Sequence, residues 1–137
     1  MKIQPTEFPQ KWDNAFQVGV PVIDEQHERL FCLIKDLETM QRKEQGSNLV
    51  NLSEAFFKIA QFAGDQLIRE EMYLQGIESP TLPRHKTLHK EFINQIVAFQ
   101  QQLQAGENPL DQTLEYLKSW FVNHCLNYDK EALKGKA

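Results

Sequence analysis

The chain contains four histidines, and each falls on the apolar face of a predicted helix. His85 and His89 are four residues apart, which places two imidazoles on one face of a helix. His27 stands near the start of an earlier helical pattern, and His124 stands near the end of the last one. A buried polar group without a partner costs about 1–3 kcal/mol, and a shared metal ion would remove that cost. The histidines therefore favour a metal site inside the protein.

Two carboxylates and one amide extend this candidate ligand set. Glu70 lies on the inward face of a long helical pattern, Gln66 lies one turn before it on the same face, and Asp129 follows His124 by five residues. Imidazole and carboxylate ligands without thiolate suit iron, manganese or zinc. A structural zinc needs about four ligands, whereas this chain offers more, two of them carboxylates that can bridge. The set favours two metals. Its strong candidates are His27, Glu70, His85, His89, His124 and Asp129.

Each of these residues also has a simpler explanation when it is taken alone. A single histidine such as His27 is more often a satisfied core or boundary residue. The spacing of the histidine pair is only moderately specific, Glu70 could form a salt bridge, and Asp129 could belong to a solvated C-terminal turn. Their joint location favours a metal, because without one several polar groups would be buried together without partners.

Hydrophobic periodicity predicts four helices that bring these residues together. Apolar residues recur with helical spacing over residues 22–41, 48–75, 83–104 and 109–128. Short connections make neighbouring helices antiparallel. The sequence therefore predicts an all-α fold, an antiparallel up-down-up-down four-helix bundle. In this bundle the starts of the first and third helices meet the ends of the second and fourth, so all the candidate ligands gather at one end.

The first 20 residues and the overall composition predict the rest of the domain organisation. Residues 1–20 predict an extended N-terminal arm that packs across the bundle, with Trp12 as its apolar anchor. A length of 137 residues predicts one domain over residues 1–137. Hydrophobic residues at 41% and charged residues at 25% are typical of a soluble globular protein.

Charge and hydropathy argue against several classes of partner. The formal charge of −4 and the absence of a basic cluster argue against a nucleic-acid surface. We read no signal peptide and no stretch long enough to span a membrane. Cys32 and Cys125 lie on separate predicted helices, which favours free thiols and a cytoplasmic protein. The oligomeric state stays open and is compatible with a monomer.

Taken together, these residues resemble the bacterial hemerythrins, which are single-domain, non-haem di-iron proteins that bind dioxygen. The resemblance covers nearly the whole chain, and its motifs are far more specific together than any one of them. The matching segments are the arm with Trp12, Val18-Gly19-Val20, Ile23-Asp24-Glu25-Gln26-His27, Arg69-Glu70-Glu71, His85-x-x-x-His89 and Trp120-x-x-x-His124-x-x-x-x-Asp129.

The resemblance implies a centre of two iron ions. One iron would take three histidines, the other would take fewer, and two carboxylates and a solvent-derived oxo or hydroxo group would bridge them. The three histidines are His85, His89 and His124, the histidine at the other iron is His27, and the bridges are Glu70 and Asp129.

The resemblance also implies a dry oxygen pocket and points to one departure from the family pattern. The family lines that pocket with residues of the last helix, which here are Trp120, Phe121, Cys125 and Leu126. These four side chains would pack as core with or without such a pocket.

The departure from the family pattern is at Gln66. The family has a histidine at this position, four residues before the bridging glutamate. Glutamine offers a neutral amide oxygen, which is a weaker ligand for ferrous iron than imidazole.

Three functions are compatible with this sequence. The first is reversible dioxygen binding for transport, storage or delivery by a protein that is not an enzyme and whose second iron site is atypical. The second is a di-iron oxidase or peroxidase, because a lost histidine opens a coordination position. The third is a bundle that senses iron, oxygen or redox state, for which Cys125 is a weak clue.

Overall fold

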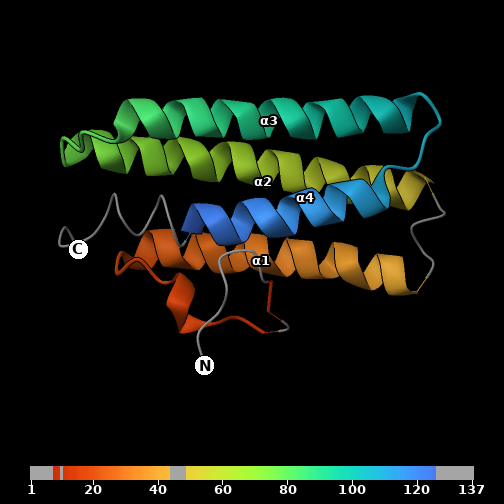
Figure 1. The fold of residues 1–137 in the computed structure, drawn as a ribbon, viewed down its shortest axis with the longest axis horizontal. Helices are drawn as coiled ribbons and strands as arrows, with labels where there is room; N and C mark the ends of the chain where they lie inside the picture. Colours follow the sequence, from red (N-terminus) through yellow and green to blue (C-terminus); the bar gives the residue numbers. More distant parts are fainter. Residues whose placement is uncertain (1–7, 10, 44–48, 126–137) are drawn as a thin grey trace.

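The computed structural model describes residues 8–9, 11–43 and 49–125, and these residues form a bundle of four α-helices (Figure 1). A short 3-10 turn, η1 (Asn14–Phe16), precedes the bundle. The predicted all-α architecture is confirmed. The helices are α1 (Pro21–Arg42), α2 (Leu49–Gly76), α3 (Leu82–Gln104) and α4 (Leu110–Asn123).

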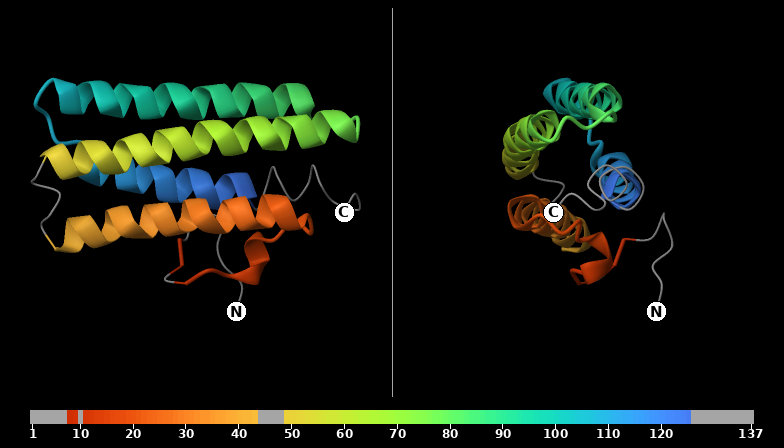
Figure 2. Two further views of the ribbon diagram at one scale, coloured as in Figure 1. Left: turned by 180° about the vertical axis from the view of Figure 1, so that it is seen from behind. Right: turned by 90° about the vertical axis from the view of Figure 1, so that its left-hand side faces the viewer.

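Successive helices run in opposite directions, as the short connections predict (Figures 1 and 2). α2 packs against both α1 and α3, and α4 packs against α1. The observed helix ends within the described residues differ from the predicted ends by at most one residue. Prolines stand in the first turns of α1 and α3, where a missing N–H costs nothing. The predicted end of the last helix at residue 128 lies outside the described residues.

The inward faces of the helices are the apolar stripes that the periodicity predicts. Their side chains are buried along the length of the bundle, and their burial is the main force that holds the helices together. On α2 the stripe changes from apolar to polar toward the C-terminal end, while the side chains stay buried. This stripe is Leu52, Phe56, Ile59, Ala63, Gln66, Glu70 and Leu74.

The N-terminal arm packs on the bundle through aromatic side chains. Phe16, in η1, is fully buried, with its ring centroid 5.3 Å from that of Phe121. Trp12 is only half-buried and lies edge-on to Phe31 at 5.8 Å. The arm is therefore anchored chiefly by Phe16, a residue that the sequence interpretation passed over in favour of Trp12.

The junction between the arm and α1 is fixed by Asp24. Its carboxylate accepts hydrogen bonds from the backbone N–H groups of Val18, at 2.7 Å, and Gly19, at 3.2 Å. Gly19 has a φ of 90°, a conformation that suits glycine. A carboxylate in the first helical turn also favours the helix dipole. This junction sets where α1 begins, and His27 follows one turn later.

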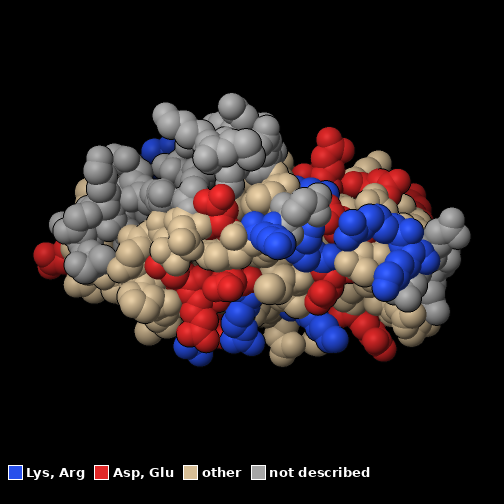
Figure 3. Space-filling model, turned by 90° about the horizontal axis from the view of Figure 1, so that it is seen from below, with Lys and Arg blue, Asp and Glu red and all other residues tan. Residues whose placement is uncertain are grey.

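The surface features agree with the composition. Acidic and basic side chains both appear on the face drawn in Figure 3, so that face does not carry a single sign of charge. Within the described residues, no helix combines the length and the apolar character needed to cross a membrane. Cys32 is exposed, Cys125 is buried, and no disulfide joins them.

Glu38 joins α1 to α4 in the half of the bundle away from the histidines. Its side chain is 11% exposed, Lys35 Nζ donates to its Oε1 at 2.7 Å, and Lys118 of α4 pairs with its Oε2. Burial alone raises the pKa of Glu38, but the ammonium groups of Lys118 and Lys35 outweigh it and hold the pKa below its usual value. The ionised carboxylate therefore stabilises this contact.

Replacing Glu38 should weaken the bundle in a pH-dependent way. Glu38→Gln should lower the free energy of unfolding of the metal-free protein by about 1–3 kcal/mol near neutral pH, because the lysines lose a charged partner. A pKa that is lowered in the folded state contributes stability above the ordinary glutamate pKa, and this is lost as the pH falls through the lowered value. Urea unfolding across this range should show the two proteins converging in acid. A difference that does not depend on pH would contradict this role.

Candidate metal centre

The four histidines and Glu70 meet at one end of the bundle core, where α1 and α3 begin and α2 and α4 end (Figure 1). Glu70 has no exposed surface, and each histidine is at most 2% exposed. A charged group buried this deeply needs partners, because it has lost its water. The antiparallel order of the helices supplies them from α1, α3 and the C-terminal end of α4. These partners are His27, His85, His89 and His124.

The carboxylate of Glu70 divides the histidines into a group of three and a single one. Oε2 lies 3.3 Å from Nε2 of His27. Oε1 lies 3.2 Å from Nε2 of His89, 3.3 Å from Nε2 of His124 and 3.7 Å from Nε2 of His85. The two oxygens therefore face two different sets of nitrogen ligands. A carboxylate so placed can bridge two metal ions.

The group of three has the spacing that ligands of a common ion require. His89 and His124 bring their Nε2 atoms to 3.2 Å from each other. Two nitrogens that each lie about 2.1 Å from one metal, at right angles to each other, are about 3 Å apart. Glu70, His85 and His124 also offer ligand atoms that all lie within 4.8 Å of one another. These residues fit a metal ion well.

The histidines also control the ionisation of Glu70. Burial alone raises its pKa, but hydrogen bonds from His124, His27 and His89 outweigh burial and hold the pKa of Glu70 well below the usual range. Glu70 is therefore an anion in the folded protein. An ionised carboxylate is the form that coordinates a cation.

Two of the imidazoles are oriented from behind through their other ring nitrogen. His89 Nδ1 lies 2.8 Å from Oε2 of Glu71, and His85 Nδ1 lies 3.3 Å from the main-chain oxygen of Thr81. A carboxylate and a carbonyl can only accept, so Nδ1 carries the proton in both contacts. Nε2 of each ring faces the carboxylate of Glu70, and a metal ion bound there would take the Nε2 lone pair in place of a proton.

Gln66 lies on α2 one turn before Glu70, and its side chain is 2% exposed. Among the described residues its Oε1 has no hydrogen-bond partner. The guanidinium of Arg29 lies 5.2 Å from the ring centroid of Phe62, and His27 contacts Glu70, so this stretch of α1 runs alongside the stretch of α2 that holds Gln66. A buried oxygen without a partner, beside a candidate metal position, fits a metal ligand.

A second buried glutamine, Gln26, precedes His27 on α1. Its side chain is 9% exposed, and its Oε1 has no partner within residues 8–9, 11–43 and 49–125. The stretches of α1 and α2 that carry His27 and Glu70 therefore each bury a neutral amide oxygen. Glu70 Oε1 faces three imidazoles and Oε2 faces one, so the two sides of this carboxylate offer metals different chemistry.

Two of the predicted oxygen-pocket residues, Trp120 and Phe121, contact different histidines of the site. The indole of Trp120 stacks on the imidazole of His124, with ring centroids 4.4 Å apart and an angle of 11° between the planes. The ring of Phe121 instead lies edge-on to His27 at 6.4 Å and is fully buried. Cys125 is buried in a wider π-type turn that follows α4 and includes His124. Such turns occur frequently at functional sites.

Two predicted residues cannot be placed, and two others were not predicted. Asp129 and Leu126 lie outside the described residues. Glu71 and Gln26 appear in the sequence analysis only within the segments that resemble the family, and neither was predicted to be part of the site. One signal could have identified Glu71: it lies 100° around the helix from an inward ligand, where it can reach a side chain on an adjacent helix.

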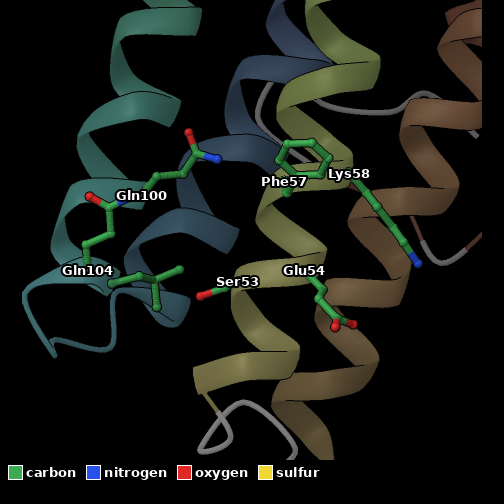
Figure 4. Close-up of a pocket in the computed structure, with 7 residues that line it drawn as sticks. Ser53, Glu54, Phe57, Lys58, Gln100 and Gln104 are labelled. Carbon is green, nitrogen blue, oxygen red and sulfur yellow. The ribbon is translucent and has the colours of Figure 1, made fainter.

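A surface groove elsewhere on the bundle is separate from this centre. It lies along α2 and α3 near the other end of both helices, where Phe57 is 59% exposed (Figure 4). Its lining contains no histidine or cysteine. The candidate metal centre is therefore an internal site of the bundle.

Comparison with known proteins agrees with this geometry. The family model described as the hemerythrin HHE cation binding domain matches residues 18–134. A bacteriohemerythrin from Stenotrophomonas maltophilia is 25% identical, over 87% of this chain and 76% of its own length. A bacteriohemerythrin from Pseudomonas aeruginosa is 27% identical, over 86% of this chain and 75% of its own length. A myohemerythrin from Theromyzon tessulatum is 29% identical, over 93% of each chain.

The match spans the arm junction, all four helices and every candidate ligand. With a buried cluster of histidine and glutamate that can hold metal, the chain belongs to the hemerythrin family of di-iron, oxygen-binding proteins.

Proposed function

We propose that this protein reversibly binds dioxygen at a di-iron centre, for transport, storage or delivery. One observation carries the proposal: the buried carboxylate of Glu70 turns one oxygen to three histidines and the other to His27. A structural site for one ion would not need a second, separate set of ligands on the far side of the same carboxylate.

The proposed ligands divide between the two metals according to which oxygen of Glu70 they face. One iron takes the three imidazoles that face Oε1 of Glu70, and the other takes His27, which faces Oε2. Gln66 completes the second set through its amide oxygen. Asp129, beyond the described residues, is the second bridge by family resemblance. The three imidazoles are those of His85, His89 and His124.

The bound iron pair supplies the electrons that dioxygen binding requires. The protein supplies orientation and a dry environment. Phe121 is fully buried and lies edge-on to His27, Trp120 covers the ring of His124, and Cys125 is buried in the apolar core. Apolar side chains keep water and protons away from a reactive group. Reversible binding is favoured where such access is restricted.

The neutral amide of Gln66 makes the second position weaker than the first. An amide oxygen donates less electron density to ferrous iron than an imidazole nitrogen does. We therefore propose that the second iron binds less tightly than the first and that the oxygenated protein is shorter-lived than one with an imidazole at this position.

The weak amide ligand of Gln66 also favours a second candidate function. A weakly held ligand at Gln66 leaves a coordination position that peroxide or water can enter. This supports a peroxidase- or oxidase-type activity, alone or beside oxygen binding.

The metal content tests the main proposal. Reconstitution of the full chain with ferrous iron under anaerobic conditions should give two irons per chain, because Glu70 separates two ligand sets. Admission of oxygen should produce a visible absorption band that disappears when oxygen is removed. His27→Ala should lower the iron content to one per chain and abolish the band, whereas the exposed-site control Glu54→Gln should retain both. One iron or none in the original protein would contradict the proposal.

Gln66→His tests the assignment of the second position. An added imidazole should raise the affinity for the second iron by about 10-fold or more. Even the mutation of a residue that only hydrogen-bonds to a metal ligand changes metal affinity by that much. It should also lengthen the lifetime of the oxygenated protein. Gln66→Leu, which fills the space without a ligand atom, is the matched control and should act in the opposite direction. If all three proteins have the same iron affinity and lifetime, Gln66 is not at the second metal.

Peroxide turnover tests the second candidate. With an electron donor present, the iron-loaded protein should consume peroxide faster than the same amount of free iron, and His124→Ala should remove this excess because it removes a ligand of the first iron. Gln66→His should also slow the reaction by closing the open position. A rate equal to that of free iron would exclude this activity.

A further inference from the structure

Glu71 is a charged residue that contacts the site without facing its centre. Its carboxylate is 23% exposed, and its Oε2 lies 2.8 Å from Nδ1 of the buried His89. Glu70, the preceding residue on α2, lies 3.2 Å from the other nitrogen of the same ring. One turn of α2 therefore places a carboxylate at each ring nitrogen of His89.

The contact behind His89 differs in kind from the contact behind His85. His85 Nδ1 faces a main-chain carbonyl on its own helix, at 3.3 Å, so it has a long contact to a neutral acceptor. His89 Nδ1 faces an ionisable side chain on another helix, at a shorter distance. Hydrogen bonds to charged acceptors are shorter and roughly twice as strong as those between neutral groups. The contact at Nδ1 of His89 is therefore the stronger of these two contacts.

We propose that Glu71 is a positioning residue for the three-histidine metal. It keeps the proton of His89 on Nδ1, fixes the rotation of the ring and makes Nε2 a stronger donor. As a result the three-histidine position is the tighter of the two and fills first. This inference rests on the proposed metal centre, and it extends that proposal to the order in which the centre fills.

A purely structural role for Glu71 predicts different behaviour. A contact that only ties α2 to α3 would change the free energy of unfolding, but not the protonation of His89 or the affinity for metal. Because the Glu71 side chain is partly exposed, its replacement leaves no large cavity, and the variants can be compared as folded proteins. The two roles can therefore be separated by experiment.

The experiment compares three variants of the full chain. Glu71→Leu removes the acceptor, Glu71→Gln keeps a neutral acceptor, and Glu54→Gln removes an exposed carboxylate near the other end of the same helix. Zinc affinity is measured by competition with a chelator, which needs neither iron nor oxygen. Nitrogen NMR of the metal-free protein reports whether His89 Nδ1 holds its proton.

Glu71→Leu should weaken the tightest zinc binding by about 10- to 100-fold and lose the protected Nδ1 proton. Glu71→Gln should retain the proton and show a smaller loss of affinity, and Glu54→Gln should match the original protein. Unchanged zinc affinity and an unchanged Nδ1 proton in Glu71→Leu would overturn the inference. An equal loss of affinity in Glu54→Gln would also overturn it, because the effect would then be general electrostatics. If these results hold but oxygen does not bind, the inference stands and the proposed function fails.

Discussion

The arrangement of this bundle depends on one requirement, which is that the buried carboxylate of Glu70 has partners around it. Glu70 has lost all contact with solvent, yet its pKa is held well below the usual range, so it must be surrounded by groups that donate to it or carry positive charge. No single helix can surround a carboxylate. The antiparallel bundle does so because two helix starts and two helix ends meet around it, and the histidines that contact the carboxylate come from these ends. The apolar stripes elsewhere hold the four ends together.

The environment of Glu70 is strongly asymmetric. On one side, three imidazoles converge, Glu71 holds one of them from behind, and the indole of Trp120 stacks on another. On the other side, His27 is the one histidine that faces Glu70, and the nearby turns of α1 and α2 bury two glutamines whose Oε1 atoms have no partner in the described part of the chain. The first side is rich in imidazole donors. The second side offers fewer of them, which is where an exchangeable ligand would be expected to enter.

Much of this arrangement could be predicted from the sequence, because periodicity and helix order are local signals. The buried faces followed from apolar spacing, and the meeting of His27, Glu70, His85, His89 and His124 followed from the antiparallel order. Their roles as iron ligands stay predictions. Phe16 and Glu71 could not be predicted with the same rules, because a turn and a flanking side chain depend on the packing of neighbouring elements. Asp129 and Leu126 lie beyond the described residues.

The central claim is that one carboxylate divides two metal positions. Anomalous X-ray scattering at the iron edge, measured on crystals of the iron-loaded protein, tests this claim most directly. The account predicts two separate iron peaks, one beside the Glu70 oxygen that faces His85, His89 and His124, and one beside the oxygen that faces His27. A single peak, or two peaks on the same side of Glu70, would contradict it.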